Sequence, residues 1–448
     1  MANLVRTLRL RDLLLLFIGS VIGSGIFLTP GAILRHVHGS VGVSMLVWAA
    51  GGVMSLLGAL TYAELAAANP EAGGLYCFIR DGFGRFPAFL YGWCLFLVIS
   101  SASIAALARA FARYLAEVVA LSPGQATAAA VAMIAIVMVV NVRGTRQSAD
   151  LQNWTTLIKA GVVVVLSAVF LLFGRHGGEI VSAAGTQQRG LELFSSFSLA
   201  MIAVLWAYEG WQFGTYSAGE VVEPQKVFPR AFLLGSVMLI GLYVVAVLAY
   251  LVALGPSAAA SSDAIAATAA RAVLGPWAGK LVALTILVSV FSASNSVVLT
   301  APRVFYAMAK DNLFFKSLAA VHPRFHTPAY AVVALCVWSV VLVYAGRFSE
   351  LIEGVVFIGW IFYGLGAAAI FPLRAALHGK ELPYRVPGYP WTPVLFLLAA
   401  AAVVGNAIFL ATQDVNQFRH ILAALVLFVL GVPAYFFWSY WNQRRVAR

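Results

Sequence analysis

The chain has 448 residues, of which 62% are hydrophobic and 10% are charged, and its mean hydropathy is +0.91. A water-soluble protein of this length has far more polar surface, so the composition indicates a membrane protein with many spans. The net charge of +12 does not indicate nucleic-acid binding, because Lys and Arg are spread in short clusters between apolar runs. The three cysteines have neither metal-ligand nor disulfide spacing, so we expect no metal site.

Hydropathy over a window of about 20 residues predicts about twelve membrane spans in one transmembrane domain that covers residues 1–448. The first span follows a basic segment and has no cleavage site, so we expect it to be retained. Loops on the side of the N-terminus hold about twice as many Lys and Arg as the other loops, which predicts that both termini are cytoplasmic. The approximate span limits are 12–36, 41–67, 84–115, 122–142, 153–174, 195–219, 229–254, 277–308, 328–346, 351–377, 391–412 and 419–442.

The first span contains several residues that weaken a helix, namely Gly19, Gly23, Gly25, Pro30 and Gly31. A helix can break at membrane depth only where the freed backbone groups face protein or a water-filled cavity. The N–H groups of Ser24, Gly25 and Ile26 would then begin a second half-helix, whose positive end suits a carboxylate. The alternative is that Gly19 and Gly23, four residues apart, form a helix-packing face.

A second interruption, at residues 206–211, contains Glu209 in the middle of the sixth span. If the first ten spans are two halves of five, the interrupted first and sixth spans occupy corresponding positions. That pattern is typical of inverted-repeat transporters with a binding site at the midplane. We therefore expect a first repeat at 12–174, a second at 195–377 and two additional helices at 391–442.

Lys159 and Glu209 are ionisable residues well inside apolar spans, where each costs about 2.5 to 3.5 kcal/mol without a partner. Lys159 either extends to the nearby cytoplasmic end of its span, or donates to carbonyls of the broken first span together with Ser289 or Ser292. Glu209 either receives an amino group, carries a proton, or holds the break by accepting from backbone N–H groups.

Other residues carry weaker expectations. Trp206, just before the second interruption, is the candidate gate, and Trp360 and Tyr363 are candidates for the opposite wall. We expect Arg303 to be a cytoplasmic anchor first and a gate residue second. Glu64 is expected to pair with Arg303 or with another arginine, Arg80. The outer connection at 255–276 has a short helical pattern and is expected to fold over the outer mouth.

Five segments together resemble the amino acid–polyamine–organocation superfamily, closest to its L-type amino acid transporter branch. They are GSVIGSGIFLTPG, YAELAAANPEAGGLYCFIRDGFG, LWAYEGWQ with GEVVEPQKVFPRA, RVFYAMAKDNLFF and PYRVPGYPWTPVLF. The resemblance covers nearly the whole chain, with the motifs in the family's order. It implies an all-α LeuT-type fold of five plus five inverted spans, with helices 1 and 6 broken, and alternating access.

The resemblance also implies a site for an α-amino acid. The amides of Ser24, Gly25 and Ile26 would bind its carboxylate, and its amino group would be received by Val21, Ile22, Trp206, Ala207 and Glu209. Lys159 matches the fifth-span lysine that occupies the second sodium site in sodium-independent members, with Ser289 as its partner. No catalytic residue, metal or cofactor is implied.

The function implied is sodium-independent transport of neutral L-amino acids, by exchange, in the plasma membrane or bacterial inner membrane. A neutral substrate is favoured because no second acidic side chain lies in the first, third, eighth or tenth span. The alternative is a proton-coupled symporter of amino acids, amines or polyamines, motivated by Glu209. A non-transporting sensor or a membrane enzyme is disfavoured, since the histidines lie in loops or at span ends.

The expected partners are the amino acid and the lipid bilayer, and not nucleic acid. Animal L-type members use a cysteine after the third span to bond a heavy subunit, and the corresponding connection at 117–126 has none. We therefore expect no disulfide-linked heavy subunit.

Overall fold

The computed structural model describes residues 4–185, 188–345, 348–377, 381–413 and 415–446. Within these ranges the regular structure is helical, apart from one isolated parallel bridge between Leu8 and Val221. This confirms the predicted all-α membrane fold. The first half contains α1 (Leu10–Val21), α2 (Gly25–His36), α3 (Val41–Ala68), α4 (Leu75–Phe83), α5 (Arg85–Cys94), the π-helix η1 (Leu95–Ile99), α6 (Ser100–Ala116), α7 (Pro123–Arg143), α8 (Thr145–Phe173) and α9 (Gly177–Ser182).

The second half of the chain begins with α10 (Gly190–Ala207), after which the 3-10 helix η2 (Trp211–Glu220) continues the same span. The remaining elements are α11 (Pro224–Leu254), α12 (Pro256–Ser261), α13 (Ile265–Leu274), α14 (Ala278–Thr300), α15 (Pro302–Lys310), the 3-10 turn η3 (Lys316–Ala319), α16 (Ala329–Ala345), α17 (Phe348–Ala368), α18 (Ile370–Ala376), α19 (Trp391–Gln413) and α20 (Val415–Val446).

In the described ranges, nine helices are long and apolar enough to cross a membrane, and the bent pair α1 and α2 makes a tenth. The predicted span 328–346 coincides with α16, whose 17 residues fall short of the length of about 20 that a straight span needs. The predicted span 419–442 lies within the longer helix α20. The full count of twelve is therefore not confirmed, and the division into two inverted halves stays a prediction.

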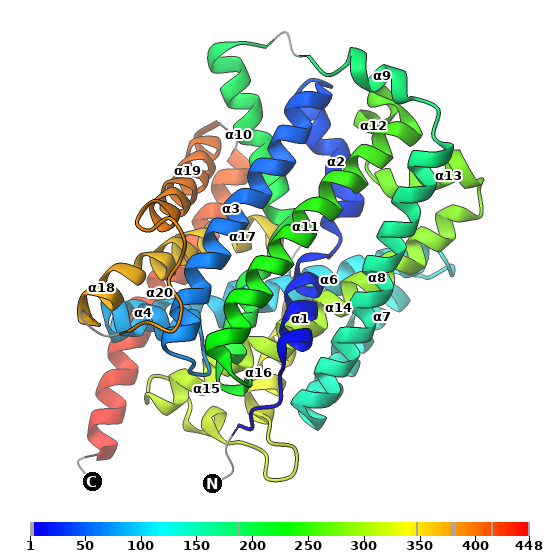
Figure 1. Ribbon diagram of the computed structural model, residues 1–448. Coiled ribbons are helices and arrows are strands. Elements are labelled where there is room, and N and C mark those ends of the chain that lie inside the picture. Colours follow the sequence, from blue (N-terminus) through cyan, green and yellow to red (C-terminus); the bar gives the residue numbers. More distant parts are fainter. Residues whose placement is uncertain (1–3, 186–187, 346–347, 378–380, 414, 447–448) are drawn as a thin grey trace.

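Helices α3 and α11 pack side by side through the middle of the bundle, with α7 and α8 on one side of them and α19 and α20 on the other (Figure 1). The N- and C-terminal ends of the chain lie at the same end of the bundle (Figure 1). At the opposite end, α12 and α13 pack against α2, so the helical pattern expected at 255–276 is confirmed. Arg35 fastens this connection to α2 by donating to the Ala260 carbonyl at 2.7 Å and pairing with Asp263 at 2.9 Å.

The end that carries the N-terminus is closed by a short strap and a buried ion pair. The N–H groups of Thr7 and Leu8 both donate to the Glu220 carbonyl at 2.9 Å, and Val222 donates back to Leu8 at 2.8 Å. The Glu220 carboxylate accepts from Arg303 Nε at 2.6 Å, and both side chains are buried. Arg303 is thus a buried ion-pair partner and not an exposed anchor, and losing one member of such a pair costs about 3–5 kcal/mol.

The prediction that Glu64 pairs with Arg303 or Arg80 is wrong. Its two carboxylate oxygens each accept from Arg374 at 2.7 Å, and one also accepts from the Val386 N–H at 2.5 Å. Arg374 lies on α18, which folds back over the end of α3 and brings a distant arginine to this carboxylate. Arg80 pairs instead with acidic residues close to it, including Asp311.

Candidate functional site

The first break lies between α1 and α2, whose axes differ by 44°. α1 ends at Val21, and the Gly23 N–H turns back to donate to the Val21 carbonyl at 2.7 Å. In the part of the chain that the structure describes, no group accepts from the N–H groups of Ser24, Gly25 or Ile26. These free donors at the start of α2 form the positive end of a helix and are suited to a carboxylate.

The second break lies between α10 and η2. α10 ends at Ala207, and Gly210 adopts a φ of +118°, a conformation that favours glycine. A Cβ at Gly210 would also lie 2.7 Å from the Ser20 carbonyl oxygen. The break is therefore fixed both by backbone conformation and by close contact with α1.

The two breaks are in direct contact. A Cβ at Gly25 would lie 2.7 Å from the Ala207 Cα, so the start of α2 touches the end of α10. The Ser20 hydroxyl donates to the Gly210 carbonyl at 3.0 Å. The structure thus brings the residues predicted at positions 21–26 together with those at 206–209.

Tyr243 of α11 joins the two breaks, and no pattern in the sequence singles it out. Its hydroxyl lies 3.0 Å from the Val21 carbonyl oxygen and 3.2 Å from that of Ala207. The ring is fully buried and packs edge-on against Trp48, with centroids 5.6 Å apart. From the sequence pattern, a tyrosine in an apolar span is expected to be an ordinary buried core residue. The contact is therefore visible only in the folded structure.

We expect Tyr243→Phe to lower the transport rate about tenfold while keeping the ring packing, because it removes the one O–H donor that the buried Val21 and Ala207 carbonyls share. The measurement is the initial rate of uptake into proteoliposomes. Tyr250→Phe is the matched control, since Tyr250 lies further along α11 and packs on Phe170 away from both breaks. Equal rates for the two variants would show that the Tyr243 hydroxyl does not hold the breaks.

Lys159 is fully buried and points to the first break. Its ammonium donates to the carbonyls of Gly19 and Ile22, both at 2.6 Å. The Ser289 hydroxyl donates to Ile22 as well, at 3.0 Å, while Ser292 contacts other residues of α8. The interpretation in which Lys159 extends to the end of its span is wrong, and Ser289 is its neighbour at the break.

Glu209 points to α17. Its Oε1 accepts from the Tyr363 hydroxyl at 2.6 Å and from Gln212 Nε2 at 2.7 Å. Among the described residues no donor reaches its buried Oε2. The donors are side chains and not the backbone N–H groups expected. Trp360 packs edge-on against Tyr363 at 6.1 Å, so the predicted opposite wall does lie against the second break.

The carbonyls expected to receive an amino group differ in how many further hydrogen bonds they can accept. A carbonyl oxygen has two lone pairs. The Ile22 carbonyl accepts from Lys159 and Ser289. The Val21 carbonyl accepts from the Gly23 N–H and lies nearest the Tyr243 hydroxyl. The Ala207 carbonyl lies 3.2 Å from the same hydroxyl, which has one proton to donate. Open acceptor capacity therefore lies on the second break, at the Ala207 carbonyl and Glu209 Oε2.

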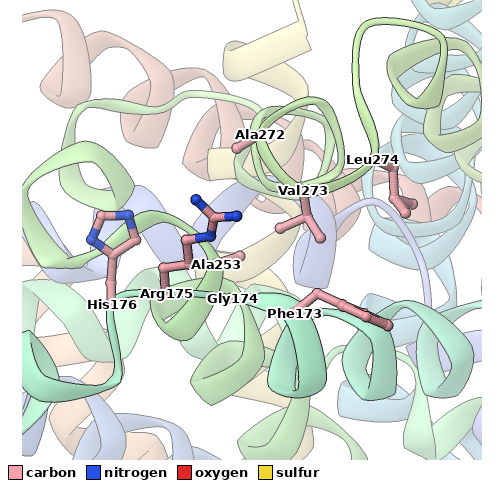
Figure 2. Close-up of a pocket in the computed structure, with 8 residues that line it drawn as sticks. All are labelled: Phe173, Gly174, Arg175, His176, Ala253, Ala272, Val273 and Leu274. Carbon is pink, nitrogen blue, oxygen red and sulfur yellow. The ribbon is translucent and has the colours of Figure 1, made fainter.

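The space between the breaks is small. A cavity of about 10 Å³ is lined by residues of both breaks, including Val21 and Tyr208, and is far smaller than the roughly 300 Å³ at which ligand pockets usually begin. A wider hollow, between α13 and the ends of α8 and α11, contains Arg175 and His176 but no residue of either break (Figure 2). The predicted site and this outer hollow are therefore separate.

An all-helical membrane protein with two broken spans in contact, and with free amides at their junction, has the architecture of a secondary transporter. The model of the family described as "Amino acid permease" matches residues 8–431, and the chain belongs to this family. Its relatives are named as transporters and exchangers, and not as enzymes.

The similarity to individual relatives extends over nearly the whole chain. The serine/threonine exchanger SteT of Bacillus subtilis is 30% identical over 426 residues, which cover 94% of each chain. The human cystine/glutamate transporter is 29% identical over 435 residues, 96% of this chain and 84% of that one. The mouse b(0,+)-type amino acid transporter 1 is 28% identical over 442 residues, covering 97% and 89%.

Proposed function

We propose that this permease is a sodium-independent exchanger of neutral L-amino acids. The observation that carries the proposal is the junction of the breaks, where the free N–H groups of Ser24, Gly25 and Ile26 begin α2 and Gly25 lies against Ala207. An α-amino acid places its carboxylate on these donors and its ammonium on the acceptors at Ala207 and Glu209. Exchange is supported by the relatives, among them a serine/threonine exchanger.

Lys159 supports sodium independence. Its ammonium is a permanent donor to the carbonyls of Gly19 and Ile22, which a sodium ion would otherwise coordinate. With the Lys159 side chain in this position, no sodium ion is needed there. Sodium-stimulated uptake would contradict this part of the proposal.

The proposed cycle is alternating access around the two breaks. The repeats at 12–174 and 195–377 would move relative to each other, with 391–442 outside them and Trp206 closing over the bound side chain. Trp206 is only partly buried in the last turn of α10, which leaves it room to turn. We place the protein in the bacterial inner or plasma membrane with both termini in the cytoplasm, supported by the bias of basic loops.

Uptake of radiolabelled neutral amino acids into preloaded and empty proteoliposomes tests the proposal. We expect uptake only into vesicles preloaded with unlabelled amino acid, unchanged when sodium is replaced by choline. Competition with cationic and anionic amino acids then tests the substrate class. Equal uptake into empty vesicles would contradict exchange, and no uptake of any amino acid would contradict the proposed function.

Proton-coupled symport of amino acids, amines or polyamines is the second candidate, because Glu209 Oε2 is buried without a donor among the described residues. If Glu209 carries the proton, uptake by the wild type is driven by a pH gradient, and Glu209→Gln removes that dependence. The measurement is uptake into empty vesicles at several external pH values. Glu192→Gln, an exposed carboxylate at the start of α10, is the control. An unchanged pH profile in Glu209→Gln would exclude this role.

We also propose that the protein works without a disulfide-linked heavy subunit. Cys77, Cys94 and Cys336 are all buried, which supports this proposal. Non-reducing electrophoresis of native membranes is the test, and a reducible adduct with another chain would contradict it.

A further inference from the structure

A basic hollow lies at the end of the bundle that carries the N-terminus. It is lined by the segment before α1, the start of α1 and the start of α8, and its basic residues are Arg6, Arg9, Arg11 and Arg146. An adjoining hollow shares Arg146 and adds three further basic residues, which are Arg143, Arg324 and His326. The two hollows together form one concave basic surface.

This surface has a surplus of positive charge. The carboxylate of Asp12 accepts from Arg146 at 2.8 and 3.0 Å, and Asp150 pairs with the same arginine. Arg9 and Arg11 are exposed, and no acidic side chain pairs with them in the ranges that the structure describes. The acidic groups nearby are therefore already used, and the unpaired arginines suit an anion.

An exposed tryptophan lies on α8 after the hollow. Trp154, further along α8, is 66% exposed, and exposed tryptophans are typical of the membrane interface. Leu157 and Val164 follow Arg146 at intervals of eleven and seven residues, so all three share one face of the helix. Both apolar residues are exposed on that face. A molecule with its anionic group at Arg146 would thus have an apolar surface directly beside it.

That face leads to an apolar groove between α8 and α11. The groove is lined by Ala160 and Val164 of α8, by Met238 and Gly241 of α11, and by Ile18 of α1. Ala160 follows Arg146 by fourteen residues, about 21 Å along the helix. One leaflet of a hydrocarbon core of about 30 Å, with its headgroups, has similar depth.

The basic hollow and the groove also share α1. Arg11 and Ile18 are seven residues apart on this helix, which puts them on the same side. Since α1 carries the first break, a ligand that spans both features would contact α1 and α8 at once.

We propose that an anionic phospholipid binds here, with its phosphate on the unpaired Arg9 and Arg11, beside the paired Arg146, and one acyl chain running over Leu157 to the groove at Ile18 and Ala160. Basic hollows beside membrane helices are suited to phosphate headgroups. The bound lipid stabilises the arrangement in which α1 is docked on α8, and so sets the position of the first break.

Native mass spectrometry of the purified protein tests this proposal, with phosphatidylglycerol, cardiolipin or phosphatidylcholine added separately. We expect the wild type to retain the two anionic lipids and to release phosphatidylcholine. The double variant Arg9→Gln/Arg11→Gln should bind phosphatidylglycerol about 30-fold more weakly. Arg175→Gln is the matched control, because Arg175 is exposed and follows the end of α8 opposite to Arg146, and this variant should bind as the wild type does.

A third variant separates a lipid from a free anion. A Cβ at Gly241 meets no atom within 4 Å, so Gly241→Leu fills the groove without a clash. It should weaken binding of long-chain phosphatidylglycerol but not of a six-carbon-chain analogue. Equal retention of all lipid classes, or unchanged binding in the double variant, would overturn the proposal. Displacement by inorganic phosphate with no effect of Gly241→Leu would show an anion site without a lipid chain, and would overturn it too.

Discussion

Replacing Lys159 by methionine is expected to reduce amino acid exchange about 100-fold or more. Methionine fills a similar volume but donates no hydrogen bond, so the carbonyls of Gly19 and Ile22 lose their 2.6 Å partner inside the bundle. The Ile22 carbonyl keeps the Ser289 hydroxyl at 3.0 Å, so the Gly19 carbonyl is the group that loses its donor. An unsatisfied buried polar group costs about 1–3 kcal/mol, and the upper end of that range corresponds to about 100-fold.

The measurement is the initial rate of exchange in preloaded proteoliposomes, in sodium and in choline. Lys280→Met, at the exposed start of α14, is the control and should exchange at the wild-type rate. A Lys159→Met protein that keeps more than a tenth of the wild-type rate in both media would show that this ammonium is not needed at the break.

Gly25→Ala is expected to lower transport about 10- to 100-fold with little loss of expression. The new Cβ would lie 2.7 Å from the Ala207 Cα and 2.9 Å from its Cβ, so α2 and α10 must separate where the substrate is proposed to bind. Overpacking of this kind costs about 1–3 kcal/mol. We expect both a lower transport rate and a weaker apparent substrate affinity.

Gly23→Ala is the control for this variant, because it adds the same methyl group two residues earlier. Its Cβ would have its nearest neighbours at 3.9 and 4.0 Å, which is ordinary contact. We therefore expect a much smaller loss. Similar losses in both variants would indicate that backbone flexibility, and not the contact between the breaks, explains the effect of Gly25→Ala.

The two breaks could be predicted because they leave local signals in the sequence. Glycines and Pro30 stand in the first span, and Glu209 with Gly210 stands in the sixth, where an uninterrupted helix would have apolar residues. Lys159 was predictable for a similar reason, since a buried ammonium must find acceptors. The direction in which it points, to the first break, required the fold.

Contacts between distant segments could not be predicted from the sequence. The pairing of Glu64 with Arg374 joins residues far apart in the chain, and no spacing rule relates them. Tyr243 has no pattern that separates it from the other buried aromatics. The number of spans was also uncertain, because α16 is shorter than a full span.

The strap at the N-terminus has a practical consequence for following the protein at work. The amides of Thr7, Leu8 and Val222 are held by three hydrogen bonds that link the first residues to the end of η2. If this end opens, these bonds must break, and the three amides exchange their hydrogens with solvent deuterium more quickly. The rate of deuterium uptake by the peptides that contain these amides thus reports how often this end opens, without an attached probe. Adding substrate should change that exchange rate.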